Sequence, residues 1–258
     1  MKTMLDTRIR RFFRLSWRKQ QVRFGSFRSL QPITHSFGFD GGLCIDRYYI
    51  ESFMSQHAED IRGHVLEIGD DAYTRSLGGE RVAKSDVLHA KEGNPNATIV
   101  ADLTRADHLP SNTFDCIICT QTLQYIYNVQ AAVRTLHRIL KPDGVVLATF
   151  PNIAHISRYD MEHWGEYWRF TGMGAERLFS TAFSPSNVKV QAYGNVLTAM
   201  AFLHGLPADR LTKEELDYSD RDYEVLVAVR AVKPKGRVPP PHKQGAKGAP
   251  HWQKTIKK

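Results

Sequence analysis

The chain has 258 residues, and 42% of them are hydrophobic, which is enough for one large α/β domain with tails. Its net charge of +8 is concentrated at the ends, because residues 1–28 hold nine Lys or Arg and one acid while residues 233–258 hold eight and no acid. The ends together carry +16, so residues 29–232 carry −8. An acidic body argues against a nucleic-acid partner, since a domain that binds nucleic acid is basic over its folded surface.

The two basic ends are predicted to flank a folded domain at 29–232. Residues 1–28 alternate arginines with aromatic and aliphatic residues, which predicts a helix. Such a helix packs on the body, lies on an anionic membrane surface, or targets the chain to an organelle. Residues 233–258 are rich in Pro, Gly and Lys and are predicted to be disordered. No apolar run reaches the ~20 residues of a membrane-spanning helix, so we expect a cytoplasmic protein that is peripheral at the membrane if residues 1–28 bind it.

The three cysteines, Cys44, Cys116 and Cys119, are too few and too unevenly placed for a disulfide framework. Cys116 and Cys119 lie in a predicted buried strand, where residues three apart point to opposite faces. We therefore expect two packed core thiols. No spacing of Cys, His and Asp indicates a metal site, so no metal is expected.

The first elements of the folded part lead toward a strand at 64–68. Residues 37–42 form a glycine-rich turn, and residues 45–54 are predicted to form a helix that lies over the mouth of a pocket. Arg47 and Tyr48, at the start of that helix, are candidates for holding a ligand carboxylate, because arginine forms bidentate pairs with carboxylates. An ion pair at the helix start is the structural alternative.

From residue 64 onward, apolar strands alternate with helices. The predicted elements are strands at 64–68, 81–86, 97–101, 114–119 and 145–150, and an amphipathic helix at 131–140 that is stopped by the turn 141–144. This alternation is typical of a doubly wound, mainly parallel α/β sheet. Glu67, Asp86 and Asp102 each fall at the carboxyl end of a predicted strand, where open α/β sheets bind their ligands.

The stretch 64–71 indicates the kind of ligand. Its strand runs into Glu67, Gly69 and two aspartates. A glycine at this point lets the backbone turn tightly and lets a ligand approach closely. A phosphate-binding loop uses bare amides and a lysine, so three acids indicate a ligand with hydroxyl groups or positive charge.

Several motifs in this order resemble the class I S-adenosylmethionine-dependent methyltransferases. They are Val65-Leu66-Glu67-Ile68-Gly69, an acid at the end of the second strand, Ala101-Asp102-Leu103 followed by Leu109-Pro110, Phe114-Asp115, and Leu140-Lys141-Pro142-Asp143-Gly144. The resemblance implies a Rossmann-like sheet of seven strands whose last strand is antiparallel. Two later apolar runs, at 188–193 and 223–229, suit the last two strands.

The resemblance implies S-adenosyl-L-methionine as the cofactor. The implied contacts are Glu67 and Gly69 at its methionine part, Asp86 at the ribose hydroxyls, Asp102 and Leu103 at the adenine, and Thr120 and Gln121 at the sulfonium and methyl group. Asp71 and Tyr73 stand where the family has glycines. Either Tyr73 lies against the ligand in a stiffened loop, with Asp71 beside it, or the loop is degraded and the protein only binds.

Residues 151–184 are predicted to cap the pocket. His155 is the first candidate for a base, because it lies closest to the strand end, and His163 is the second. A structural or surface position is the alternative for both. Trp164 and Trp168 are candidates for stacking on a polar, ring-shaped acceptor, and Arg169 adds an ionic contact. Packing of the cap onto the core would explain the tryptophans equally well.

These observations predict an S-adenosylmethionine-dependent methyltransferase that acts on a small molecule or glycan, at oxygen. An RNA or protein methyltransferase with basic arms is a second hypothesis, although no Asn/Asp-Pro-Pro-Tyr/Phe motif follows residue 119. A non-catalytic methyltransferase-like binding protein is a third. A nicotinamide-dependent oxidoreductase is a fourth, and the missing G-x-G-x-x-G argues against it.

Overall fold

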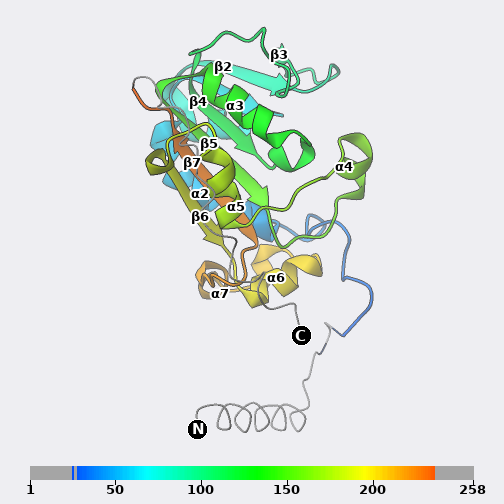
Figure 1. Ribbon diagram of the computed structural model, residues 1–258. Coiled ribbons are helices and arrows are strands. Elements are labelled where there is room, and N and C mark those ends of the chain that lie inside the picture. The colour runs from blue at the N-terminus through cyan, green and yellow to red at the C-terminus, as the bar shows by residue number, and fades with distance from the viewer. Residues whose placement is uncertain (1–24, 26–27, 236–258) are drawn as a thin grey trace, which may run out of the picture.

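A computed structural model describes residue 25 and residues 28–235 of the chain (Figure 1). The helix expected at 1–28 and the tail expected at 233–258 therefore lie almost wholly outside the described residues. Within the described part, a single sheet has the strand order β3-β2-β1-β4-β5-β7-β6. Its strands are β1 (Gly63–Ile68), β2 (Val82–His89), β3 (Ile99–Val100), β4 (Phe114–Thr120), β5 (Leu140–Pro151), β6 (Val188–Tyr193) and β7 (Leu226–Val232).

The sheet is parallel except at β7. Strand β1 pairs in parallel with β2 and β4, and β2–β3 and β4–β5 are parallel as well. Strand β7 pairs antiparallel with β5 on one side and with β6 on the other. The predicted doubly wound, mainly parallel sheet of seven strands with an antiparallel last strand is thus confirmed.

Helices cover both faces of the sheet (Figure 1). Helices α2 (Ile45–Gln56), α6 (Val196–Leu203) and α7 (Lys213–Asp217) contribute to one core, and α3 (Val129–Ile139) and α5 (Gly172–Phe179) contribute to the other. A short helix, α4 (Arg158–His163), stands away from the sheet on a long excursion after β5. None of the described helices combines the length and apolar character that a bilayer crossing requires.

Strand β4 shows why the two cores are separate. Ile117 and Cys119 belong to the core beneath α3, whereas Cys116 and Ile118 belong to the core beneath α2. Both cysteines are buried and free. Their placement on opposite faces follows from the two-residue period of a strand, as expected from the sequence.

Several element boundaries differ from the sequence prediction. Strand β2 continues to His89, because its backbone pairs with β1 as far as Leu88 and with β3 as far as His89. Asp86 therefore lies inside β2, and its expected place at the strand end was wrong. The turn expected to precede the fifth strand, 141–144, is instead an irregularity within β5, where the register with β4 shifts.

The connection from β1 to β2 is short, as its length indicated. It contains one π-helical turn at Thr74–Gly78 and a 3-10 turn at Gly79–Arg81.

The excursion expected as a cap at 151–184 is shorter than predicted. Residues of α5 such as Ala175 and Phe179 are buried in the main core, so the part that stands away from the sheet ends near residue 169.

Candidate functional site

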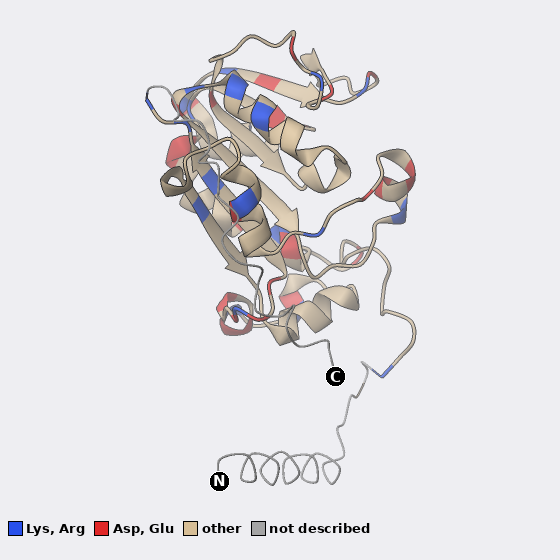
Figure 2. Ribbon diagram, in the orientation of Figure 1, with Lys and Arg blue, Asp and Glu red and all other residues tan. Residues whose placement is uncertain are grey.

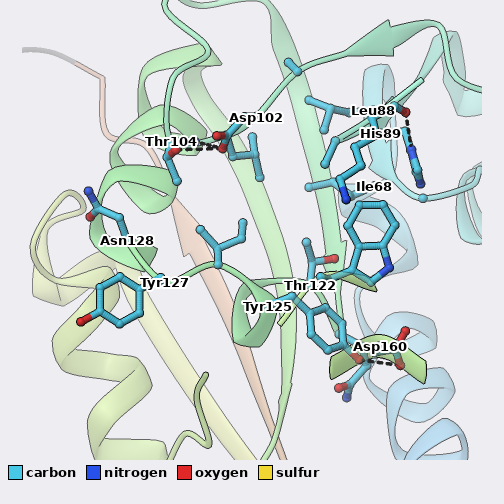
Figure 3. A pocket seen from close by; sticks show the side chains of 18 of the residues that line it. Ile68, Leu88, His89, Asp102, Thr104, Thr122, Tyr125, Tyr127, Asn128 and Asp160 are labelled. Carbon is cyan, nitrogen blue, oxygen red and sulfur yellow. Dashed lines mark hydrogen bonds between the residues drawn. The ribbon is translucent and has the colours of Figure 1, made fainter. Parts of the chain in front are cut away.

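A cavity of about 620 Å³ lies at the carboxyl ends of β1, β2, β3 and β4 (Figure 3). Its volume is in the range of small-molecule sites. The wall consists of Ile68 and Gly69 at the end of β1, residues 88–91 at the end of β2, residues 101–104 after β3, residues 120–122 and 125–128 at and beyond the end of β4, and Asp160, Trp164 and Tyr167 from the excursion after β5. Of the nine predicted cofactor contacts, the cavity wall includes Gly69, Asp102, Leu103, Thr120 and Gln121.

Gly69 turns the chain at the cavity edge. Its φ of 97° lies in the region that favours glycine, and a Cβ built on it would meet no atom within 4 Å. Its N–H donates to the carbonyl of Leu88 at 3.0 Å, and its own carbonyl accepts from Asn94 Nδ2 at 2.7 Å. The glycine is therefore required by the backbone conformation, and it leaves the adjacent space open.

Glu67 does not line the cavity, although it precedes Gly69 by two residues. Its side chain is 1% exposed and accepts hydrogen bonds from the backbone N–H of Tyr73 at 3.2 Å and of Thr74 at 2.8 Å. The Thr74 hydroxyl donates a third at 2.7 Å. Burial raises the pKa of Glu67, and these three bonds oppose that rise. In this structure the carboxylate holds the turn after β1.

The two residues that replace family glycines also point elsewhere. Asp71 forms an ion pair with Arg75 at 3.0 Å on the surface of the turn. Tyr73 is buried, and its phenol oxygen accepts a hydrogen bond from Arg47 Nη1 at 2.8 Å. Neither lines the cavity, so the expectation that Tyr73 lies against the ligand is not supported. Burial raises the pKa of Tyr73, which keeps the phenol protonated.

Asp86 is fully occupied by protein partners. Its Oδ2 lies 2.6 Å from His64 Nε2 and 2.9 Å from Lys84 Nζ, and its Oδ1 accepts from the Thr98 hydroxyl at 2.8 Å. Burial alone would raise the pKa of Asp86, but the hydrogen bonds from these partners outweigh it and lower that pKa. The carboxylate is absent from the cavity wall, where the end of β2 presents His89 instead.

Asp102 and Leu103 lie where the sequence placed them. Asp102 Oδ1 accepts from the backbone N–H and the hydroxyl of Thr104, both at 2.8 Å, which leaves Oδ2 without a hydrogen-bond partner among the described residues. Leu103 is buried in the wall. Together they combine a free carboxylate oxygen with an apolar surface, as an adenine ring with an exocyclic amine requires.

The residues just past β4 carry unsatisfied amide groups. Gln121 has a φ of 45°, and its side-chain Oε1 accepts from Gln124 Nε2 at 3.1 Å. The other amide atoms, Gln121 Nε2 and Gln124 Oε1, are buried and have no hydrogen-bond partner among residues 28–235. Buried polar atoms in native proteins are normally paired. Gln121 also lines the cavity, so its unpaired amide lies beside the ligand space.

The excursion after β5, residues 152–169, forms the outer wall of the cavity and is called the cap below. Trp164, a predicted acceptor contact, lines the cavity, and Lys91 Nζ lies 4.5 Å from its ring centroid. Lys91 also donates to the carbonyl of His163 at 3.2 Å. The cap is thereby attached to the end of β2.

The two candidate bases lie outside the cavity wall. The His155 ring stacks on Phe37 with centroids 3.6 Å apart, and its Nδ1 lies 3.1 Å from the carbonyl of Ile156. Its Nε2 is buried and has no hydrogen-bond partner in the described part of the chain. His163 is exposed on α4, where its Nδ1 lies 2.7 Å from the carbonyl of Tyr159.

The remaining predicted substrate residues support the cap or α2. Tyr48 donates to Asp217 at 2.7 Å, and Arg47 is bound to Tyr73. Arg169 pairs with Glu166 at 2.6 Å and donates to the backbone carbonyl of His155 at 3.1 Å. None of Arg47, Tyr48 and Arg169 reaches the cavity wall.

The sequence analysis singled out Trp168 but missed two tyrosines that lie beside it at the cavity mouth. Tyr127 lies 5.4 Å from Tyr167 and 6.0 Å from Trp168, measured between ring centroids. Trp168 Nε1 donates to the carbonyl of Ile126 at 3.0 Å. Tyr127 and Tyr167 line the cavity, and Trp168 supports them from outside. The tyrosines at 125 and 127, directly after the 114–120 strand, were the available signal.

The donor set fits a sulfonium nucleoside. The cavity wall contains two carboxylates, of Asp102 and Asp160, and the free amide of Gln121, beside apolar Leu103 and Ile126. Among the described residues of the wall, Lys91 is the only Lys or Arg. Carboxylates suit ribose hydroxyls and a positive charge, whereas a nucleotide phosphate would need several N–H donors or cations.

Comparisons with known proteins show what this chain is similar to. Residues 64–148 match the family model described as methyltransferase domain. Among solved structures, the chain is similar to an S-adenosylmethionine dependent methyltransferase from Mesorhizobium loti, with 17% identity over 76% of this chain and 100% of that chain and a TM-score of 0.49. It is also similar to a SAM dependent methyltransferase from Archaeoglobus fulgidus, with 12% identity over 72% and 94% of the two chains and a TM-score of 0.49. A comparison with curated proteins finds no significant match.

Proposed function

We propose that this chain, whose residues 64–148 match the methyltransferase domain model, is an S-adenosylmethionine-dependent methyltransferase that methylates a hydroxyl oxygen of a small molecule or glycan. Bound S-adenosyl-L-methionine supplies a methyl group on a positively charged sulfur. Gly69, Asp102, Leu103 and Gln121 hold it at the carboxyl ends of the strands. The protein then has to place the acceptor oxygen in line with that methyl group, and positioning of this kind supplies much of the acceleration.

The aromatic rim at the cavity mouth supports a ring-shaped acceptor. It consists of Tyr127, Tyr167 and Trp168, and the two tyrosines are 72% and 50% exposed. Exposed aromatic faces that are held by mutual contacts offer stacking area at low entropic cost. The hydrogen bond from Trp168 Nε1 to the Ile126 carbonyl fixes the indole, so the rim is ordered before any acceptor arrives. A sugar or phenol ring suits such a surface.

The charge of the site favours a small acceptor over RNA. A strand of RNA is held mainly through its phosphates by several Lys or Arg side chains. The described cavity wall has Lys91 alone, beside the two carboxylates of Asp102 and Asp160. The basic residues 1–28 remain proposed as a contact with an anionic membrane surface, and loss of sedimentation with anionic liposomes on their deletion tests that proposal.

His155 is the proposed base. Since the Ile156 carbonyl can only accept a hydrogen bond, the contact at 3.1 Å assigns the ring proton to Nδ1 and the lone pair to Nε2. That Nε2 has no partner among the described residues. Bound S-adenosyl-L-methionine would supply the methyl group to the acceptor oxygen, and His155 Nε2 would take the proton of the acceptor hydroxyl. His163 is the second candidate.

A labelled-methyl transfer screen over sugars, phenols, lipids and RNA tests the acceptor class. We expect label in a sugar or phenol and, after chemical degradation, on oxygen. Label found only in RNA would overturn the proposal. The complete chain should be used, since the basic ends distinguish the small-acceptor hypothesis from the RNA hypothesis.

Paired histidine variants test the base. His155→Gln should lower turnover by about 10²-fold or more while affinity for S-adenosylhomocysteine stays the same. His163→Gln is the matched control on the same cap and should retain turnover. Turnover by His155→Gln close to that of the wild type rules His155 out, and a loss in His163→Gln alone transfers the role to His163.

A further inference from the structure

We propose that Asp160, on the cap, is a cofactor-binding residue whose carboxylate accepts hydrogen bonds from the donor groups of bound S-adenosyl-L-methionine. The inference rests on the cofactor of the proposed function and is independent of the acceptor. The donors that a carboxylate can reach on this cofactor are the ribose hydroxyls and the α-ammonium group. Both groups donate hydrogen bonds to a carboxylate, and the experiment below distinguishes them.

A carboxylate that binds the cofactor has to come from an element other than β2. Asp86, the acid that the sequence assigned to the ribose, lies inside the strand and is occupied by His64, Lys84 and Thr98. The residue that β2 presents at its end is His89, and its Nδ1 lies 2.6 Å from the carbonyl of Lys91. Strand β2 therefore offers the cofactor no carboxylate.

Two carboxylates line the described cavity, and they lie in different places. Asp102 follows β3, whereas Asp160 comes from α4. Figure 3 shows the two side chains on opposite sides of the cavity. One carboxylate oxygen of Asp102 already accepts hydrogen bonds from Thr104. With Asp102 on the adenine side, Asp160 is the carboxylate that can contact the cofactor on the opposite side of the cavity.

The Asp160 side chain is held in position but not neutralised. Its backbone N–H donates to the Ser157 hydroxyl that caps α4, and its Oδ2 accepts from the Tyr125 phenol at 3.1 Å (Figure 3). Burial and then the charge of Asp160 raise the pKa of Tyr125, so the phenol remains a hydrogen-bond donor. Oδ1 has no hydrogen-bond partner among the described residues.

The charge of Asp160 also lacks a cation. Within the described residues no Lys, Arg or His forms an ion pair with it, whereas the neighbouring cap acid Glu166 is paired with Arg169 at 2.6 Å. Lys91, the cationic side chain of the wall, is directed to the Trp164 ring. S-adenosyl-L-methionine carries a sulfonium, an ammonium and one carboxylate, and thus a net charge of +1. An unpaired carboxylate in the wall complements that charge.

A contact from α4 to the cofactor would also couple the cap to binding. The cap is attached to the body by Tyr167 N–H, which donates to the Gln124 carbonyl at 2.9 Å, and by Lys91, which donates to the His163 carbonyl. Figure 2 shows that α4 contains both acidic and basic residues and stands apart from the other helices. A ligand held by Asp160 would therefore slow the opening of this segment.

Calorimetric titration of the complete chain with S-adenosylhomocysteine tests the proposal. Asp160→Asn should weaken binding at least tenfold, because a charge-assisted acceptor is lost. Glu162→Gln, which removes the same charge from an exposed position of α4, is the matched control and should bind within twofold of the wild type. Binding by Asp160→Asn within twofold of the wild type would overturn the proposal.

A second ligand identifies the donor group. The probe 5′-methylthioadenosine keeps the ribose and lacks the amino acid. An equal loss of affinity for both ligands in Asp160→Asn assigns the carboxylate to the ribose hydroxyls, and a loss confined to S-adenosylhomocysteine assigns it to the ammonium. Hydrogen exchange of residues 158–163 should slow when S-adenosylhomocysteine binds the wild type and should stay fast in Asp160→Asn.

A further variant tests the assignment even if Asp160→Asn fails to fold. Tyr125→Phe removes the phenol that orients Asp160 and leaves the carboxylate in place, so we expect a smaller loss of affinity, about threefold. Unchanged affinity in both Tyr125→Phe and a folded Asp160→Asn would overturn the assignment. Failure of the acceptor screen leaves these binding results intact, whereas a wild-type chain that does not bind S-adenosylhomocysteine would contradict both proposals.

Discussion

The hydroxyl and the backbone N–H of Thr74 both donate to Glu67 Oε2, at 2.7 and 2.8 Å. This pair closes the turn after β1 from within. A glycine-rich turn holds its shape through the freedom of its backbone, but here a buried carboxylate holds the turn instead. Asp71 and Tyr73 are therefore accommodated without contact with the cavity.

Thr74→Val should lower the free energy of unfolding by about 1–2 kcal/mol, because it removes one hydrogen bond to a buried carboxylate and keeps the side-chain volume. Urea unfolding measures the loss. Ser76→Ala, on the exposed face of the same turn, is the control, and its effect should stay within ~0.5 kcal/mol. Equal stability of Thr74→Val and the wild type would show that Glu67 does not hold the turn.

The two aspartates assigned to the cofactor from the sequence should behave differently. Asp102→Asn should weaken S-adenosylhomocysteine binding about tenfold, because Asp102 lines the cavity with a free oxygen. Asp86→Asn should change that affinity less than twofold and instead lower stability, because it breaks contacts with His64 and Lys84. Calorimetry and thermal unfolding of both variants separate the two effects, and a tenfold affinity loss in Asp86→Asn would contradict this structure.

Stability should depend on pH through His137. Burial lowers the pKa of His137 to about 4 from the ordinary value of 6.5, and its Nε2 has no hydrogen-bond partner among the described residues. Between these two pH values the unfolded chain binds the proton and the folded chain does not. Stability should therefore fall as the pH falls from about 6.5 to about 4, by roughly 1–3 kcal/mol.

His137→Leu removes this titration, so the decline between pH 6.5 and pH 4 should become shallower. Urea unfolding at several pH values measures it. A decline of the same slope in His137→Leu would show that other groups cause it. Above pH 7 the two proteins should show parallel pH profiles, since His137 is neutral there in both states.

The aromatic rim should govern the acceptor and not the cofactor. Once an acceptor is identified, Trp168→Ala should raise its KM about tenfold, because the indole that supports Tyr127 is lost, while S-adenosylhomocysteine affinity stays the same. Trp168→Phe keeps a ring and should recover part of the loss. A fall in kcat at constant KM would instead indicate that Trp168 positions the cap.

Much of the fold could be predicted from local patterns. The strand at 188–193 and the core of β4 follow from runs of apolar and β-branched residues, and the opposite faces of Cys116 and Cys119 follow from the period of a strand. The alternation of strands and helices predicted a parallel sheet, and with it the edge at which Gly69 and Asp102 meet. These features depend on residues that are close together in the sequence.

Other features were decided by the tertiary structure. The end of β2 depends on pairing with β1 and β3, which extends the strand to His89 and places Asp86 inside it. Glu67 turns toward Thr74 because the turn has N–H groups that need an acceptor. Asp160 lines the cavity because of the way the cap folds, and there it accepts a hydrogen bond from Tyr125, which lies 35 residues earlier in the chain. A sequence pattern records which residues alternate, but the direction of a polar side chain depends on which partners the folded chain brings within hydrogen-bonding distance.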